Sequence, residues 1–269
     1  MVQLVPLTFG LTFPEGPRWK DGKLWFSDFY SHWVYTVDLE GNREAIVQVP
    51  GQPSGLGWLS NGDLLIVSMR DQRVMRWNGG LLTVHADLSP FARFHCNDMI
   101  VLSSGRAYVG NFGFDTHSEA PQTTNLICVE PDGSARIAAK DMSFPNGMVT
   151  LEGETTLVVA ESVSQCLTTF DIEPDGSLSN RRIFARTPDC QPDGICLDAD
   201  GNILVTTMTC NALVKFAPDG VYLKTLTFDV PTWSCAATDD GEVLLCTSRV
   251  SAPEDCIRER SGAVQRVVF

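Results

Sequence analysis

Four short segments of the chain carry an oxygen-bearing side chain at the same position of a recurring unit: Glu15, Asn97, Asn146 and Asp193. Three of these residues follow a proline and precede a glycine, whereas the Asn97 segment reads Cys-Asn-Asp-Met. Two carboxylates and two amides form a donor set that suits a hard divalent cation and balances its charge. The set favours Ca²⁺, with Mg²⁺, Mn²⁺, Zn²⁺ or Fe²⁺ as alternatives. The pattern predicts a metal-centred hydrolase.

The elements that must position these residues are short strands joined by tight turns. Turn signals recur mostly at intervals of about twenty residues, and each separates two apolar, β-like runs. Glycine after Asp, Asn, Glu or Ser supplies the positive φ of a hairpin. No segment shows a sustained helical period. The turn glycines are Gly22, Gly41, Gly62, Gly79, Gly105, Gly133, Gly176, Gly201, Gly220 and Gly241.

A longer period relates the four oxygen-bearing positions. Counted from Glu15, equivalent positions fall at Ser54, Asn97, Asn146, Asp193 and Ser234, which are separations of 39, 43, 49, 47 and 41 residues. Such a period with two hairpins in each unit is typical of a β-propeller. We therefore predict an all-β chain that forms one domain over residues 1–269, a six-bladed propeller with four antiparallel strands per blade.

Closure of the ring is predicted at the chain ends. Val264 to Phe269 supplies the third strand of the last blade, and the N-terminal strand Leu4 to Phe9 supplies its outer strand. Innermost strands line the axis of a propeller, so the equivalent residues at their entry ends are expected to converge at one mouth of the channel. The alternative is that these segments only begin strands and hydrate the channel mouth.

The same topology assigns each connection between strands to one of the two faces of the propeller. The turn glycines fall on the face opposite the converging residues, and the longer connections fall on the near face. Long loops beside a ligand cluster often shape a pocket. Residues 112–124 and 249–262 are therefore candidates for substrate walls or lids. The other near-face connections are residues 28–33, 69–73, 162–165 and 208–211.

Net charge and composition limit the kinds of molecule that the protein is expected to bind. A net charge of −13 and a pI near 4.6 argue against binding to nucleic acid or anionic lipid. The first residues form neither a signal peptide nor a membrane span. Nine cysteines without C-x-x-C spacing fit a reducing compartment. We expect a cytoplasmic protein, a monomer or weak homodimer, that acts on a small molecule. Cys96 beside Asn97 is either a nucleophile or a packing residue.

The chain resembles the senescence-marker-protein/gluconolactonase family, which includes regucalcin and luciferin-regenerating proteins. The resemblance runs over nearly the full length and is carried by the segments Glu15-Gly16-Pro17-Arg18-Trp19, Asn97-Asp98, Pro145-Asn146-Gly147, Pro192 to Asp198 with Gly201, and Asn211 to Phe216. It implies a six-bladed propeller, a divalent metal held by Glu15, Asn97, Asn146 and Asp193, and hydrolysis of a lactone ring. It also implies that Asp193 acts as general base.

Two departures from the family pattern concern the substrate. Sugar-lactone members often place Arg two positions before the first metal Asn and Gly two positions after it, whereas His95 and Met99 stand here. A lactone with fewer hydroxyls, or a more aromatic one, fits better with the aromatic residues expected near the rim. We predict substrate contacts from His95, Asp98 and Phe112. His95 either contacts substrate, supports a ligand by hydrogen bonding or shuttles a proton, and Asp98 orients Asn97 or a metal-bound water.

Two other functions remain open at this level. The same Lewis acid would polarise the P=O bond of a phosphotriester, so a phosphotriesterase-like hydrolase is one alternative. A non-catalytic metal-binding propeller is the other. Paired assays with a lactone and an organophosphate separate the two hydrolases, and inactivity on all lactones would favour the scaffold.

Overall fold

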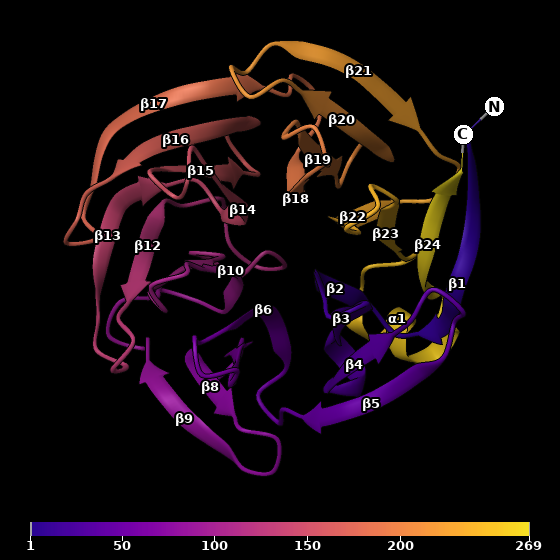
Figure 1. Cartoon of the computed structure of the whole chain (residues 1–269), viewed down its shortest axis with the longest axis horizontal. Coiled ribbons are helices and arrows are strands. Elements are labelled where there is room, and N and C mark those ends of the chain that lie inside the picture. The colour runs from indigo at the N-terminus through magenta and orange to yellow at the C-terminus, as the bar shows by residue number, and fades with distance from the viewer. Residues whose placement is uncertain (1, 269) are drawn as a thin grey trace.

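The computed structural model describes residues 2–268 and consists of six four-stranded antiparallel sheets arranged around a central axis (Figure 1). The first three blades, each from its innermost to its outermost strand, are β2 (Pro14–Lys20), β3 (Lys23–Asp28), β4 (Trp33–Val37) and β5 (Arg43–Gln48); β6 (Pro53–Trp58), β7 (Leu64–Ser68), β8 (Arg73–Trp77) and β9 (Leu82–Asp87); β10 (Cys96–Val101), β11 (Ala107–Asn111), β12 (Thr124–Val129) and β13 (Ala135–Met142). The last three are β14 (Pro145–Leu151), β15 (Thr156–Glu161), β16 (Cys166–Ile172) and β17 (Leu178–Arg186); β18 (Pro192–Leu197), β19 (Ile203–Thr207), β20 (Ala212–Phe216) and β21 (Tyr222–Thr227); β22 (Thr232–Ala237), β23 (Val243–Thr247), β24 (Gly262–Val268) and β1 (Gln3–Leu11). The predicted six-bladed propeller is confirmed.

The last blade closes the ring by pairing the two ends of the chain. β1 runs antiparallel to β24, with Gln3 opposite Val268 and Leu11 opposite Gly262. The predicted closure by an N-terminal outer strand is therefore confirmed. Both strands are longer than the sequence indicated, and Phe269, which we placed at the end of the third strand, lies outside the described residues.

The hairpin chemistry read from the sequence is present at every predicted turn. The ten turn glycines all have positive φ, between +75° and +92°. These turns join the first strand of a blade to the second, or the third to the fourth. Because an L side chain is strained at such φ values, glycine at these positions stabilises the hairpins that define the blades.

The core lies between neighbouring blades, which pack face to face. One cluster joins Val158 and Leu167 of the fourth blade to Ile195, Val205 and Val214 of the fifth, all of them buried. Alternation along each strand places such residues on both faces of a blade, so every sheet is covered on two sides. This packing fixes how far each innermost strand lies from the axis.

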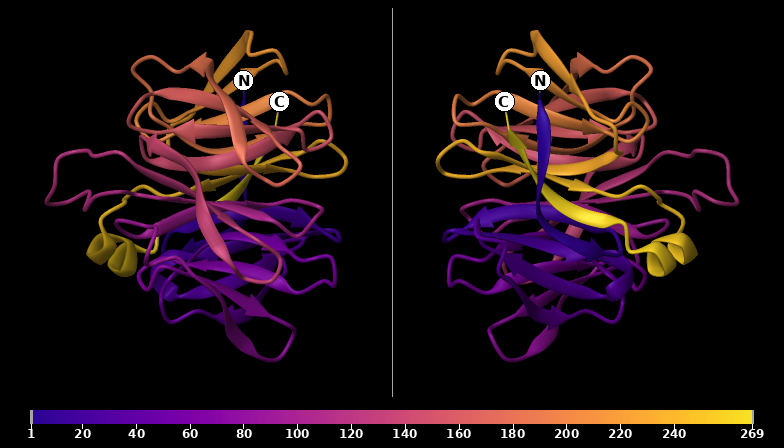
Figure 2. Two further views of the ribbon diagram at one scale, coloured as in Figure 1. Left: turned by 90° about the vertical axis from the view of Figure 1, so that its left-hand side faces the viewer. Right: turned by 90° about the vertical axis from the view of Figure 1, so that its right-hand side faces the viewer.

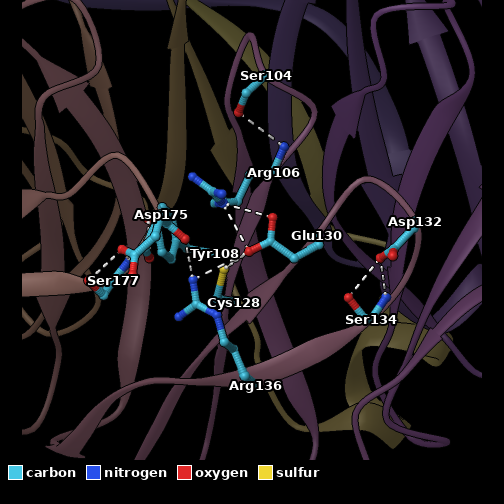
Figure 3. A network of polar contacts seen from close by, with 11 residues as sticks. Ser104, Arg106, Tyr108, Cys128, Glu130, Asp132, Ser134, Arg136, Asp175 and Ser177 are labelled. Carbon is cyan, nitrogen blue, oxygen red and sulfur yellow. Dashed lines mark hydrogen bonds and ion pairs between the residues drawn. The ribbon is translucent and has the colours of Figure 1, made fainter.

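A polar network joins the third and fourth blades on the far face (Figure 3). The guanidinium of Arg106 pairs with Glu130 at 3.0 Å, and Arg136 pairs with the same carboxylate at 3.3 Å. Arg136 also donates to the backbone carbonyl of Asp175 at 2.8 Å, and the Tyr108 hydroxyl donates to the next carbonyl at 2.9 Å. The network ties a turn of one blade to the strands of its neighbour.

Two short helical segments interrupt the strands on the near face. They are the 3₁₀ turn η1 (Phe29–Ser31) and α1 (Pro253–Glu259). The sequence analysis predicted no helix, because seven residues are too few for a periodic signal. The residues that favour α1 as a helix lie at its two ends. A proline, Glu254 and Asp255 stand in its first turn, and Arg258 stands in its last turn. No helix in residues 2–268 has the length and hydropathy needed to cross a bilayer.

Figure 2 shows that α1 and the loop after β11 project from the same face of the disc. These are the two segments predicted as substrate walls or lids. The loop after β11 contributes Thr116 and His117, and the connection that carries α1 contributes Ser251, to one cavity on this face. The near face therefore holds the longest connections and a cavity, as predicted.

Candidate metal centre

Each innermost strand is irregular at the recurring segment. In β14, Pro145 pairs with Glu161 and Met148 with Val159, so one extra residue is inserted opposite β15. The same one-residue bulge occurs in β2, β6, β10, β18 and β22. A bulge bends a strand and re-aims a side chain. Six bulges in register thus give the predicted ligand positions a common geometry at the mouth of the channel.

The glycine after the ligand position allows neighbouring innermost strands to approach closely. A Cβ atom on Gly147 would lie 2.4 Å from the backbone nitrogen of Ile195, and one on Gly194 would lie 2.1 Å from the Ser234 hydroxyl. Real Cβ atoms do not tolerate such contacts with backbone. The glycines of the Pro-x-Gly segments are therefore required by packing between blades.

We expect Gly147→Ala to destabilise the protein by about 2 kcal/mol, because β14 and β18 must separate to admit the methyl group. Urea unfolding followed by tryptophan fluorescence measures the effect. The matched control is Gly80→Ala, where an added Cβ has open space and φ is not in the positive range, so the free energy of unfolding should change by less than about 0.5 kcal/mol. Equal stability of the two variants would contradict this explanation of the motif.

The four predicted ligands line a single cavity of about 420 Å³ on the near face. Asn97, Asn146 and Asp193 are buried and Glu15 is half-buried. The Asn146 side chain lowers the pKa of Asp193 and the Ser234 side chain lowers that of Glu15, so each carboxylate has a polar neighbour in the cavity. Residues far apart in the sequence are thus brought together at the centre of the ring, where β2, β10, β14 and β18 lie (Figure 1).

The two carboxylates of the cavity are held in an unfavourable environment. Burial, followed by repulsion from Asp98, raises the pKa of Glu15 to about 8. Burial, followed by repulsion from Glu15 and Asp98, raises the pKa of Asp193 well above its ordinary value. Neither carboxylate forms an ion pair with a side chain within residues 2–268. Two buried acids in mutual repulsion are the arrangement that a bound cation stabilises.

The third carboxylate nearby has its own partner. Arg18 donates to Asp98 at 2.7 Å and to the Met99 carbonyl at 2.5 Å, which joins the first blade to the third. Since Arg18 balances Asp98, the remaining charge of −2 is that of Glu15 and Asp193. The donor set therefore fits one divalent cation. Among residues 2–268 no group of three or more His, Cys, Asp or Glu is arranged as a metal site, and half of the predicted ligands here are amides.

Hydroxyl groups at the near ends of second strands fix the backbone beside the ligand positions. Ser27 donates to the carbonyl of Ser54 at 2.6 Å, and Ser162 donates to the carbonyl of Pro192 at 2.7 Å. Thr206 donates to the carbonyl of Trp233 at 2.8 Å. Each of these bonds runs from one blade to the next. They fix the relative position of innermost strands where the bulges occur.

One sequence assignment at the sixth position is wrong by one residue. Thr232 pairs with Thr247 as Pro192 pairs with Thr207, so Trp233 is the structural equivalent of Asp193. We had placed Ser234 there. The sixth unit lacks the Pro-x-Gly signature, so the sequence gave no marker for the register. Trp233 lines the cavity, whereas Ser234 lies one residue further along and supports Glu15.

The three predicted substrate contacts occupy different places. Phe112 lines the main cavity and an adjoining chamber of about 260 Å³. His95 lines only the adjoining chamber, and burial together with Arg70 lowers its pKa, so its imidazole is neutral near pH 7. Asp98 is engaged by Arg18 and does not line either space, which differs from the substrate contact that we expected.

Of the two roles considered for Cys96, nucleophile and packing residue, the structure supports packing. Its side chain is fully buried, and burial raises the pKa of its thiol to about 12. A thiol that remains protonated at neutral pH is a poor nucleophile. Cys96 therefore packs beneath the site.

A disulfide joins two near-face connections and was not predicted. Cys190, which precedes β18, is bonded to Cys210 between β19 and β20. The neighbouring residues Gln191 and Met208 line the main cavity. The sequence analysis took the nine cysteines to fit a reducing compartment and named no disulfide. A separation of twenty residues with no C-x-x-C spacing gave no sequence signal.

Reduction of this disulfide is expected to lower the free energy of unfolding by about 3 kcal/mol, because it closes a loop of about twenty residues. Thermal unfolding with and without dithiothreitol measures the effect. The double variant Cys190→Ser/Cys210→Ser should have the stability of the reduced protein and should no longer respond to dithiothreitol. A wild type that does not respond to reductant would contradict the prediction.

The fold and cavity define a six-bladed propeller with an acidic cluster at its axial mouth, and the sequence comparisons place it within a family. The family model for the SMP-30/Gluconolactonase/LRE-like region matches residues 13–249, and the chain belongs to this family. It is similar to L-arabinolactonase of Azospirillum brasilense, at 26% identity over 257 residues, which covers 92% of this chain and 85% of that protein.

Two further comparisons agree. Regucalcin of Xenopus laevis is 23% identical over 269 residues, covering 94% of this chain and 89% of regucalcin. The solved structure of a gluconolactonase from Xanthomonas campestris aligns with a TM-score of 0.80 and 21% identity, covering 99% of this chain and 89% of that chain. At this identity the structural likeness supports the fold.

Proposed function

We propose that the protein is a metal-dependent lactonase that hydrolyses a lactone ring to the hydroxy acid. Family membership and a relative named for lactone hydrolysis support the reaction class. The single observation that carries the proposal is the carboxylate pair of half-buried Glu15 and buried Asp193, which line one cavity with Asn97 and Asn146. Such a pair has the charge and donor types for one divalent cation.

A divalent cation held by Glu15, Asn97, Asn146 and Asp193 would supply a Lewis acid for the lactone carbonyl. Asp193 accepts a proton from the attacking water, and the water oxygen forms a bond to the carbonyl carbon. The bond from that carbon to the ring oxygen then breaks. The protonated Asp193 returns its proton to the ring oxygen, which leaves as an alcohol. The Asn146 side chain lowers the pKa of Asp193 and so favours the ionised form that accepts the proton.

A pH-indicator assay tests the proposal. The protein is stripped with a chelator, reloaded with Ca²⁺, Mg²⁺, Mn²⁺, Zn²⁺ or Fe²⁺ one at a time, and offered γ- and δ-lactones and the organophosphate paraoxon. Lactone hydrolysis that depends on a reloaded cation supports the proposal. Hydrolysis of paraoxon alone would favour the phosphotriesterase alternative, and stoichiometric metal without any turnover would favour a metal-binding scaffold.

A further inference from the structure

The walls of the cavity carry aromatic side chains on two opposite sides of the predicted ligands. On the side of the first and last blades, the Phe13 ring packs at a tilt against Trp233, with ring centroids 4.9 Å apart, and against Phe29 at 5.5 Å. On the side of the third and fourth blades, Phe144 lies 4.7 Å from Phe112 and 6.1 Å from Phe114. All six of these residues line the cavity. The acidic cluster thus lies between two aromatic surfaces.

Few polar groups remain for a substrate. Two of the aromatic lining residues carry polar groups, the Tyr30 hydroxyl and the Trp233 indole. Apart from these and the four predicted ligands, the polar lining residues are Thr116, His117, Gln191 and Ser251. The Tyr30 hydroxyl already donates to the Ser251 carbonyl at 3.4 Å, and the Trp233 indole donates to a backbone carbonyl at 3.1 Å. Among the described residues, no arginine or lysine lines this cavity.

A polyhydroxylated ring requires a hydrogen-bonding partner for each buried hydroxyl group, and this cavity offers few such partners. A sugar lactone carries hydroxyls on most of its ring carbons, and each hydroxyl that is buried against an aromatic surface loses its hydrogen bonds to water. Sites that recognise hydroxyls supply a matched polar partner for each of them. An alkyl or aryl group has no such requirement and gains from burial against Phe112 and Phe144.

The adjoining chamber gives the substituent a place. It shares Phe29, Tyr30 and Phe112, together with Thr116 and His117, with the main cavity. Met69 and Phe94 add apolar wall, and Arg70 and Asp115 line the chamber as well. The His95 ring stacks on Phe94 at 4.1 Å and its centroid lies 6.2 Å from that of Phe112, so one wall of the chamber consists of ring surfaces. The main cavity alone, at about 420 Å³, is within the range of sites for drug-sized ligands.

We propose that the substrate is a lactone bearing an apolar ring or alkyl substituent, with the lactone carbonyl at the acidic cluster and the substituent against Phe112 in the adjoining chamber. This assignment rests on the proposed function. It differs from the sugar lactones for which the relatives are named.

The first test compares rates on four lactones with the cation-loaded protein: δ-gluconolactone, δ-valerolactone, δ-decalactone and dihydrocoumarin. We expect kcat/KM for the last two to exceed that for δ-gluconolactone at least tenfold, which is about the effect of a few buried methylene groups. Rates without protein are subtracted. A kcat/KM for δ-gluconolactone equal to or above that for δ-decalactone would overturn the proposal.

The second test locates the substituent. Phe112→Ala should lower kcat/KM for δ-decalactone at least tenfold more than it lowers kcat/KM for unsubstituted δ-valerolactone. The control Tyr222→Ala removes an exposed ring from the outer strand β21 and should leave both values unchanged. An equal loss on both lactones in Phe112→Ala would show that the substituent does not lie against this residue.

A binding measurement separates the two proposals. Lactams are not hydrolysed, so calorimetric titration with 6-pentyl-2-piperidone and with gluconolactam reports substrate preference without any reaction. Tighter binding of the pentyl compound by at least tenfold supports the apolar substrate even if no lactone is turned over, in which case only the proposed reaction fails. Tighter binding of gluconolactam would overturn the substrate assignment.

Discussion

Asp193→Asn should lower kcat for lactone hydrolysis by about a thousandfold, within the range that a positioned general base contributes. The amide keeps an oxygen ligand, but it cannot accept the proton from water. The fold should remain, because the substitution conserves volume in a buried position and removes a charge that burial disfavours. Steady-state kinetics on the cation-reloaded variant, with metal content determined on the same sample, measures the effect.

The matched control for this variant is Asp200→Asn. Asp200 is exposed in the hairpin between β18 and β19 on the far face, and its replacement makes the same change in net charge. Its activity should stay within twofold of wild type. If Asp193→Asn retains a tenth or more of wild-type kcat while binding stoichiometric cation, Asp193 is not the general base.

The cation-free protein should lose on the order of 4 kcal/mol of stability as the pH rises from 4.5 to about 8. Burial and repulsion raise the pKa of Glu15 from 4.5 to about 8 in the folded state. In this window the folded protein retains a proton that the unfolded chain has released, so the free energy of unfolding falls as pH rises. Asp193, whose pKa is raised in the same way, adds to this trend. Urea titrations of chelator-treated protein at several pH values measure the slope.

A bound divalent cation should reverse this trend. It favours the ionised carboxylates, so its stabilising effect grows with pH, and its binding near pH 7 should release protons. Glu15→Gln should flatten the pH profile of the cation-free protein and weaken its response to cation. A stability of the cation-free wild type that is level or rises between pH 5 and pH 8 would contradict the predicted burial of the two acids.

The parts of the fold that could be predicted are those set by local chemistry. Gly22, Gly62 and Gly201 follow Asp or Asn and occupy positive φ, so each hairpin was visible without tertiary information. Their spacing gave the number of blades. The segment around Asn146 was also local, because its proline and glycine mark one position in the repeat.

The parts that could not be predicted depend on contacts between blades. The bulge in β22 shifts the register so that Trp233 takes the place that we gave to Ser234, and only strand pairing reveals it. The ion pair from Arg18 to Asp98 spans 80 residues of sequence and crosses from one blade to another. The bond between Cys190 and Cys210 depends in the same way on two loops meeting over the cavity.

The pairing of β1 with β24 has a consequence for the order in which the molecule is completed. β1 precedes all other strands of the propeller in the chain and its partner β24 follows them, so its hydrogen-bonding edge has no native neighbour until β24 has been synthesised. An unpaired edge can pair with another chain. A growing chain therefore carries this open edge until β24 forms, and the pairing of this seven-residue strand with β1 covers the edge and closes the ring.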